Sequence, residues 1–226
     1  MLVDFSHTHL GTYLTIKDLE TDNRDTRLNL YPWLMEAYHQ WHPDELIAVA
    51  RPHHILLAGE KAAFDGSNSV DCSLRKIVEY RWVFPDGQTA KQPKAAKTFD
   101  KPGAHVVALW VKDDKGFEDV DFCQVKVYSR PNPEKAMPHL FMTYYPTRDL
   151  KPDQSVFFRF WFQGNGGGSI QVDFDDGAQV SDYKSYTELE HAFTTPGIHV
   201  VTARCEADGK PITQKLKVIV RSSRDH

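Results

Sequence analysis

Cysteine is scarce in this sequence, and its cysteines do not form a metal-binding pattern. The chain has three, Cys72, Cys123 and Cys205, and it contains no C-x-x-C pair. An odd number of cysteines cannot form a complete disulfide framework, and zinc knuckles use closely spaced cysteine pairs. The cysteine pattern therefore argues against a disulfide-rich miniprotein and against a zinc knuckle.

Long runs of one residue type are also missing. No lysine- and arginine-rich stripe is present, and the formal net charge is -4, which argues against a nucleic-acid partner. No apolar stretch approaches the ~20 residues that a membrane-spanning helix needs. The start of the chain lacks the basic and apolar regions of a signal peptide. We therefore expect no membrane span, and a secreted location would require that a signal has been removed or that the chain ends a longer protein.

Signatures of a hydrolase active site are incomplete. The sequence contains neither G-x-S-x-G nor G-D-S. Asp4, His7 and His9 have the residue types of a metal-dependent hydrolase or of an esterase Asp–His pair, but residues 10–50 leave no room for the α/β domain that either site needs. We expect no catalytic residue in this chain, and these three residues form either a polar loop or the end of an enzyme domain upstream.

What the sequence does contain is an internal repeat. The D-G turns at 86–87 and 176–177 lie 90 positions apart, and the P-G-x-H-V-V segments at 102–107 and 196–201 lie 94 positions apart. The second copy therefore has a longer connection between its two turns, as expected for a surface loop. Repeats of solenoid proteins are shorter than this, so the pattern predicts two domains in tandem.

Within each copy the residues alternate with the period of a β-strand. In VEYRWVF (78–84), Val78, Tyr80 and Trp82 alternate with charged residues, and in HVVALWV (105–111) Trp110 falls on the outward face. The D-G and P-G pairs mark turns between such strands. Short alternating strands with regular turns indicate an antiparallel β-sandwich.

The order of these motifs is that of a known module. Residues 52–129 contain in succession FDGSNSVD, YRWVFPDG, KPGAHVVALWVKD and CQVKV, and this succession resembles the PKD domain, the immunoglobulin-like module named after polycystic kidney disease. Residues 140–221 match its second half through VDFDDG and TTPGIHVVTARC, but Val172 stands where the core tryptophan would be. The resemblance implies an all-β protein with two tandem immunoglobulin-like (PKD-type) β-sandwiches.

We predict four parts along the chain. They are an N-terminal helical or irregular segment at 1–50, a PKD domain at 51–129, a Pro-rich linker at 130–139 and a second PKD-like sandwich at 140–221. A short helix is expected at 31–41, where apolar residues recur at helical spacing and Pro32 falls in the first turn. The N-terminal segment is too short for a core of its own, so it packs on the first sandwich or belongs to an upstream domain.

Outward-facing aromatic residues are the strongest sign of a binding surface. In SVFFRFWFQ (155–163), alternate residues form an apolar inward stripe, and Phe157, Arg159 and Trp161 form the opposite face. Sugar-binding modules use exposed aromatic rings beside hydrogen-bonding groups. We therefore treat these three residues and Trp110 as candidate carbohydrate-binding residues. The alternative is that they pack against a neighbouring domain or against the N-terminal segment.

Two further candidate sites depend on the implied fold, in which the B–C and F–G loops lie at the same end. This arrangement would bring Asp71 close to Asp113 and Asp114, whose carboxylates could hold Ca²⁺. Aspartates at turns more commonly cap backbone N–H groups, and we expect no other cofactor. The same arrangement would allow a disulfide between Cys72 and Cys123, closing a loop of about 50 residues.

These observations predict a non-catalytic accessory β-sandwich module of a secreted or cell-surface bacterial protein. It would act as a spacer or as a weak carbohydrate- or protein-binding unit, with a polysaccharide or a neighbouring catalytic domain as partner. The resemblance implies an extracellular, periplasmic or cell-surface location. The alternative is that the chain is the C-terminal part of a polysaccharide-directed hydrolase whose catalytic domain lies upstream of residue 1. Adhesion through open sheet edges is a third hypothesis.

Overall fold

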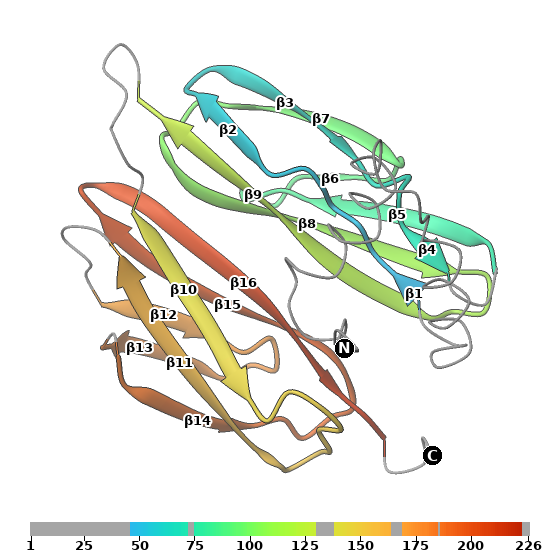
Figure 1. Cartoon of the computed structure of the whole chain (residues 1–226), viewed down its shortest axis with the longest axis vertical. Helices are drawn as coiled ribbons and strands as arrows, with labels where there is room; N and C mark the ends of the chain where they lie inside the picture. Colours follow the sequence, from blue (N-terminus) through green and yellow to red (C-terminus); the bar gives the residue numbers. More distant parts are fainter. Residues whose placement is uncertain (1–45, 72–74, 130–137, 164–168, 185, 223–226) are drawn as a thin grey trace, which may run out of the picture.

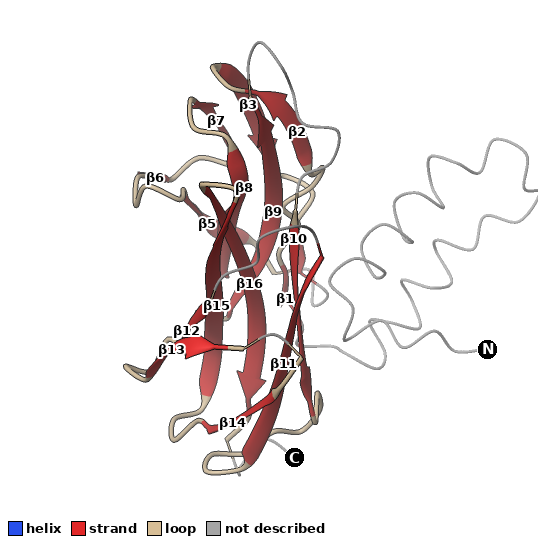
Figure 2. Cartoon of the chain, turned by 90° about the vertical axis from the view of Figure 1, so that its left-hand side faces the viewer, coloured by secondary structure: helices blue, strands red, loops and turns tan. Residues whose placement is uncertain are grey.

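The structure, a computed structural model, describes residues 46–71, 75–129, 138–163, 169–184 and 186–222. Every regular element in these ranges is a β-strand (Figure 2), which confirms the predicted all-β class. The helix expected at 31–41 lies outside the described residues. The strands form two sandwich-like units that lie side by side (Figure 1).

The first sandwich is built from a small sheet and a large one. Its strands are β1 (Leu46–Ile47), β2 (His54–Leu57), β3 (Glu60–Asp65), β4 (Val70–Asp71), β5 (Ile77–Val83), β6 (Thr89–Ala90), β7 (Lys94–Phe99), β8 (Gly103–Asp113) and β9 (Glu118–Tyr128). The antiparallel pair β3–β7 faces a sheet in the order β6–β5–β8–β9–β2, in which β2 runs parallel to β9. β1 pairs with β4 at the margin.

Trp82 is at the centre of the first core. It is fully buried and packs on Phe64, with 5.4 Å between the ring centroids, and its Nε1–H donates to the carbonyl of Pro93 at 3.4 Å. Val78, predicted to face inward with Trp82, is instead 55% exposed. A β-bulge between Ile77 and Glu79 shifts the register there, and Ile77 packs against the core in its place.

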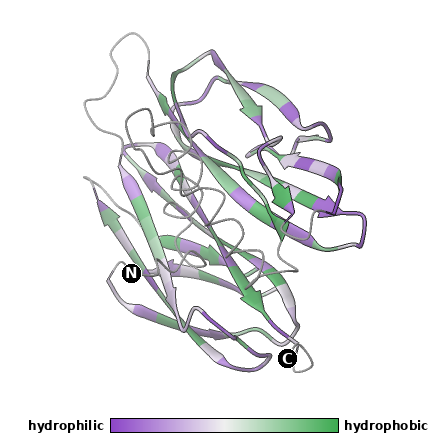
Figure 3. Cartoon of the chain, turned by 45° about the vertical axis from the view of Figure 1, so that its right-hand side comes forward, coloured by the Kyte–Doolittle hydropathy of each residue, from purple (hydrophilic) through white to green (hydrophobic). Residues whose placement is uncertain are grey.

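The second sandwich has the same plan. Its strands are β10 (His139–Tyr145), β11 (Ser155–Gln163), β12 (Ile170–Asp173), β13 (Gln179–Tyr183), β14 (Glu188–Ala192), β15 (Gly197–Ala207) and β16 (Lys210–Val220). The sheet β10–β11–β14 faces the sheet β13–β12–β15–β16, and green apolar positions alternate with purple polar ones along the strands (Figure 3). Where the first core has a tryptophan, this one has the smaller Val172, beside the fully buried Phe158 and Phe160 of the opposite sheet.

The repeated histidines occupy equivalent positions in the two units. The Nε2 atom of His105 lies 3.0 Å from the carbonyl oxygen of Lys101, and that of His199 lies 2.9 Å from the carbonyl oxygen of Thr195. A carbonyl oxygen can only accept, so each imidazole donates through Nε2. The shared P-G-x-H sequence therefore forms one local structure twice: each histidine fastens the turn before its own strand.

The two sandwiches are joined by a shared sheet and a shared apolar layer. β16 runs parallel to β8, with Ile212 opposite Ala104, so strands of both units form one continuous sheet. The outer side chains of β8 and β9 pack against Val200 of β15. This layer consists of Val106, Ala108, Val120, Phe122 and Val200, with Val83, Trp110 and Ile198 at its margin. Ala104 of the first unit also belongs to the second core.

Polar contacts cross the same junction. The Lys217 ammonium of β16 donates to Asp119 Oδ1 of β9 at 2.6 Å, and both side chains are largely buried. The Gln124 amide donates to Gln214 Oε1 at 2.8 Å. A partly buried ion pair is screened by water and salt much less than an exposed one, so these contacts help to fix the relative orientation of the units.

The residues that lead into β2 form part of the first sandwich. The apolar segment 46–50, which we predicted to belong to the N-terminal part, is buried over β9, and alternate side chains join the first core. Carboxylates of β9 satisfy its backbone: Ala48 N–H donates to Asp119 Oδ2, and Ala50 N–H donates to Asp121 Oδ2, each at 2.8 Å. The Asp119 carboxylate thus connects the entering chain, the first sandwich and Lys217 of the second.

Candidate functional site: an aromatic sheet face

The outer face of the sheet β10–β11–β14 carries two stacked aromatic pairs. Phe141 lies opposite Trp161, with ring centroids 5.1 Å apart and planes 5° apart. Tyr145 lies opposite Phe157, with centroids 5.2 Å apart and planes 21° apart. Along each strand the two pairs are four positions apart, which corresponds to a distance of ~13–14 Å. We call these four residues, together with Arg159 and Glu188, the aromatic face.

A polar group lies between the two pairs. The Glu188 carboxylate of β14 accepts hydrogen bonds from the Tyr145 hydroxyl at 2.7 Å and from Arg159 Nε at 3.0 Å, and the Arg159 guanidinium also lies over the Tyr145 ring. The hydrogen bond from Tyr145 lowers the pKa of Glu188, and the same bond raises the pKa of Tyr145. The face therefore presents an ionised carboxylate and a protonated phenol.

The ring geometry determines which part of each aromatic ring this face presents to a ligand. Nearly parallel planes at these centroid distances describe offset stacking, so each ring covers one face of its partner. Because the partners come from neighbouring strands, the rings stand upright on the sheet and direct their edges outward. The aromatic face is thus a pair of ridges and not a flat sugar platform.

The structure brings together three of the four predicted binding residues. Phe157, Arg159 and Trp161 lie on one face of β11, as the alternation predicts. Trp110 lies on the other sandwich, where it borders the apolar layer of the junction and has the Arg81 guanidinium over its ring at 5.2 Å. Trp110 thus has the packing environment that we considered as the alternative.

Sequence reasoning missed the partners on the adjacent strands. The segment HLFMTYY (139–145) alternates as a strand, and this alternation could have placed Phe141 and Tyr145 outward. No local signal gives the register of β10 against β11, because side-chain neighbours across strands depend on the pairing. The approach of Glu188 likewise depends on the long connection between β11 and β14.

The predicted calcium ligands come together, but around a side-chain cation. Asp71 and Asp113 both lie beside Arg75, whose Nε atom is 3.1 Å from Asp71 Oδ2 and 2.9 Å from Asp113 Oδ2. Asp114 is exposed next to them, and its backbone N–H donates to the carbonyl of Lys76. Within the ranges that the structure describes, no group of three or more His, Cys, Asp or Glu side chains is arranged to hold a metal ion.

The hydrogen bonds of Asp113 are those of a turn cap. Burial raises the pKa of Asp113, but the N–H groups of Phe117 and Lys115 and the charge of Arg75 outweigh it, so the pKa lies below its ordinary value. Both N–H groups donate to Asp113 Oδ1, at 2.8 and 2.9 Å. This carboxylate therefore closes the β8–β9 turn, as aspartates at turns commonly do.

Cys123 is a free, buried thiol of the first core. It lies in the middle of β9, opposite Val107. Its Sγ lies 3.2 Å from the carbonyl oxygen of Pro52, and burial raises its pKa to about 12. The proposed partner, Cys72, lies outside the described residues, and the surroundings of Cys123 favour a thiol.

Comparisons with known proteins agree with the motif order. The model of the PKD domain family matches residues 46–127. Collagenase ColQ1 of Bacillus cereus is 40% identical over 80 residues, which cover 32% of this chain and 8% of the collagenase. Collagenase ColA of Clostridium perfringens is 31% identical over 80 residues, which cover 35% of this chain and 7% of the collagenase. This chain therefore spans less than a tenth of the length of these relatives.

A solved structure resembles part of this chain. The PKD1 domain of the Vibrio cholerae metalloprotease PrtV is 29% identical and covers 36% of this chain and 93% of its own length, with a TM-score of 0.30. The described part of the chain contains no helix that could span a membrane. Residues 46–127 of this chain are thus the part that is similar to the PKD-domain family.

Proposed function

We propose that this chain is a rigid two-module accessory unit that sets the distance and orientation of a neighbouring catalytic domain relative to a polymeric substrate. The junction between the sandwiches carries the proposal. A continuous sheet, an apolar layer and a buried ion pair join the units, whereas a flexible tether would need none of these contacts. A spacer can set a distance and an orientation only if its two units do not move relative to each other.

The entering chain supports the same function. The segment 46–50 is held by Asp119, which also binds Lys217 of the second sandwich. A domain upstream of residue 46 would thus be anchored to both units at once. We propose that such a domain is a hydrolase that lies upstream of residue 1, as in the alternative stated above.

The relatives suggest which polymer is involved. The matched proteins are named collagenases, so a polypeptide fibre is as suitable a substrate as a polysaccharide. Collagen fibres and structural polysaccharides of cell walls and matrices lie outside the cell, and we therefore propose an extracellular or cell-surface location.

The rigidity of the junction can be measured directly. Small-angle scattering and NMR alignment should describe the intact chain as one body. Val200→Asp would place a charge in the apolar layer, and the two units should then tumble separately. Ile219→Asp, at an exposed position of β16, is the matched control. Independent tumbling of the unsubstituted units would refute the spacer function.

The aromatic face supports a second function, contact with the polymer itself. Tyr145 is 43% exposed and lies beside an organised carboxylate, so a partner with apolar surface and hydrogen-bonding groups fits it. Binding of the chain to insoluble polysaccharides and to fibrous collagen should be compared with that of Trp161→Ala. Phe117→Ala removes an exposed ring of the first sandwich and serves as control. Equal binding by both variants, or none by the intact chain, would refute this function and leave the spacer function untouched.

A further inference from the structure

The ion pair at the junction has the geometry of a reactive pair. Lys217 Nζ lies 2.6 Å from Asp119 Oδ1, and the two side chains are only 11% and 7% exposed. The amine of one sandwich and the carboxyl group of the other are therefore held in contact where water has little access. Two groups held in this way can condense to an amide, because their orientation is fixed before the reaction begins.

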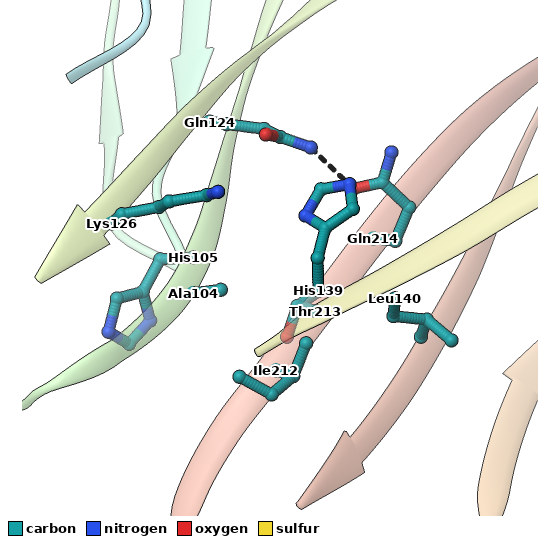
Figure 4. A pocket seen from close by; sticks show the side chains of 9 residues that line it. All are labelled: Ala104, His105, Gln124, Lys126, His139, Leu140, Ile212, Thr213 and Gln214. Atoms are coloured by element: carbon teal, nitrogen blue, oxygen red, sulfur yellow. Dashed lines mark hydrogen bonds between the residues drawn. The ribbon is translucent and has the colours of Figure 1, made fainter. Parts of the chain in front are cut away.

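Neighbouring contacts keep the two strands from moving apart. The Gln124 amide of β9 donates to Gln214 Oε1 of β16 at 2.8 Å, and Figure 4 shows this bond between the two strands. The backbone pairing of β16 with β8 fixes the same strand at a second point. The backbone that carries Lys217 is thus held against the first sandwich by contacts that do not involve the lysine itself.

The surroundings of the pair penalise charge. Burial raises the pKa of Asp121, which lies two positions along β9 from Asp119, although the charge of Arg51 and the N–H group of Ala50 oppose this shift. A site that penalises charge favours transfer of a proton from an ammonium group to a carboxylate. This transfer leaves a neutral amine, whose lone pair makes it a nucleophile.

A backbone donor is placed to stabilise the intermediate of such a reaction. The Ala48 N–H group donates to Asp119 Oδ2 at 2.8 Å. When an amine attacks the carboxyl carbon, negative charge gathers on this oxygen, and a fixed N–H group lowers the energy of the intermediate. Asp121 is a buried acid whose Oδ1 forms no hydrogen bond within the described part of the chain. It is therefore the candidate to relay protons.

We propose that Lys217 and Asp119 condense to an isopeptide bond that joins the two sandwiches covalently. The Nζ–Cγ bond forms and the Cγ–Oδ1 bond breaks. Two of the three ammonium protons pass to Oδ1, which leaves as water, and the third stays on the amide nitrogen. One positive and one negative charge disappear together, and the step requires no oxidant.

Mass spectrometry of the full chain tests the bond. After incubation of the purified chain at neutral pH, its mass should be lower than that of the sequence by one water molecule. Trypsin should release residues 116–126 and 216–221 as one linked peptide, because it does not cleave after an acylated lysine. The linked peptide is the decisive result, since a succinimide at an Asp-Gly pair also loses water.

Lys217→Arg is the variant that should abolish the bond. It keeps the positive charge, but a guanidinium group stays protonated and does not form the amide. Lys112→Arg is the matched control, because Lys112 lies 2.9 Å from Glu118 in an exposed ion pair, and it should keep the linked peptide. Asp121→Asn, isolated directly after synthesis and then incubated, should form the linked peptide about a hundredfold more slowly, because the proton relay is lost.

A folded, unsubstituted chain that keeps its full mass after prolonged incubation would overturn the proposal. Loss of water that persists in Lys217→Arg, without a linked peptide, would overturn it as well. Equal rates in Asp121→Asn and the unsubstituted chain would overturn the role of Asp121 as relay. The inference does not depend on the spacer function, because the mass reports the bond and tumbling reports the rigidity.

Discussion

The two sandwiches stabilise the same corner with different side chains. In the first, Lys97 Nζ lies 2.6 Å from Asp86 Oδ2, and in the second, His191 Nε2 lies 2.7 Å from Asp176 Oδ2. The aspartates are equivalent by the repeat, and so are their partners. The geometry of the pair is therefore kept while the partner of the aspartate changes from a lysine to a histidine.

The aromatic residue below each pair shows the same exchange. The Lys97 ammonium lies 5.2 Å from the centroid of the Phe84 ring, whereas the His191 ring stacks on Phe174 with 3.9 Å between centroids. A lysine uses the ring electrostatically, and a histidine also buries its own flat surface against it. This position requires a hydrogen-bond donor whose side chain also packs on the phenylalanine ring. Both lysine and histidine meet this requirement.

The outer faces of the small sheets, by contrast, have diverged. On β3–β7 the exposed Ala63 and Ala96 lie opposite each other, whereas the corresponding sheet of the second unit carries the aromatic face. Core and turns are thus repeated, while the surface differs. Under the proposed second function, the residues that contact the polymer would therefore belong to the second sandwich.

The largest expected difference between the units concerns their central core residues. Trp82→Ala should lower the free energy of unfolding by about 3–5 kcal/mol, whereas Val172→Ala should cost about 2 kcal/mol, because a smaller volume is lost. Urea unfolding of the full chain measures both. Val78→Ala, at an exposed site, should stay within about 0.5 kcal/mol of the unsubstituted chain. Equal costs for Trp82→Ala and Val172→Ala would show that both cores collapse around the missing side chain.

The glycines of the two P-G turns offer a sharper comparison. Gly103 and Gly197 both have positive φ, 150° and 137°. A Cβ on Gly103 would lie 2.6 Å from the Pro211 carbonyl oxygen of the second sandwich, whereas a Cβ on Gly197 would meet nothing within 4 Å. Both alanine variants should cost about 1–3 kcal/mol of strain, and Gly103→Ala should cost about 1–3 kcal/mol more from the clash. Thermal unfolding of the two variants tests this, and equal midpoints would contradict the close junction.

The Asp86 and Asp176 corners should respond to acid. The hydrogen bond from Lys97 lowers the pKa of Asp86; burial opposes the shift at Asp176, but the Ala178 N–H and His191 outweigh it. A folded-state pKa below the unfolded value gives stability that is present above the unfolded pKa and lost as pH falls through the folded one.

Substitution of each aspartate by asparagine tests this sign. At neutral pH, Asp176→Asn should cost up to about 1 kcal/mol, and Asp86→Asn less, because that carboxylate is more exposed and screened. Both costs should shrink as the pH falls through the lowered folded-state pKa values, because the carboxylates then become protonated. Costs that stay constant with pH would mean that the pairs act only by packing.

The smallest expected contrast is between the thiols. Burial raises the pKa of Cys123 to about 12 and that of Cys205 to about 11. Because only the thiolate is alkylated, both should react slowly, and the half-buried Cys205 should react before Cys123. Peptide mapping after timed iodoacetamide treatment gives the order. Faster labelling of Cys123 would indicate that β9 opens locally.

Much of the fold could be predicted because its signals are local. The D-G and P-G turns, the period of two and the inward positions of Trp82 and Phe158 follow from neighbouring residues. The prediction for Val78 was wrong because a bulge inserts one residue and turns the preceding ones over. Trp110 was predicted to be a candidate binding residue on the outward face. Alternation along a strand separates two faces but does not show which other segment packs on the outer one.

The candidate sites could be predicted less well because each depends on pairing between distant segments. Phe157, Arg159 and Trp161 were identified from one strand, but their partners come from β10 and β14. The approach of Asp71 to Asp113 was predicted from the positions of their loops. The sequence did not predict that Arg75 would lie between the two carboxylates.

Local residue order therefore accounts for the strands, the turns and the duplication, since backbone preference and side-chain alternation act over a few residues. The register of β10 on β11 and the junction through β16 follow only from the folded chain. These features arise where side chains that are far apart in the sequence come within hydrogen-bonding distance, such as Lys217 and Asp119, which are 98 positions apart. A short stretch of sequence cannot determine such a contact, because the contact depends on how distant segments pack.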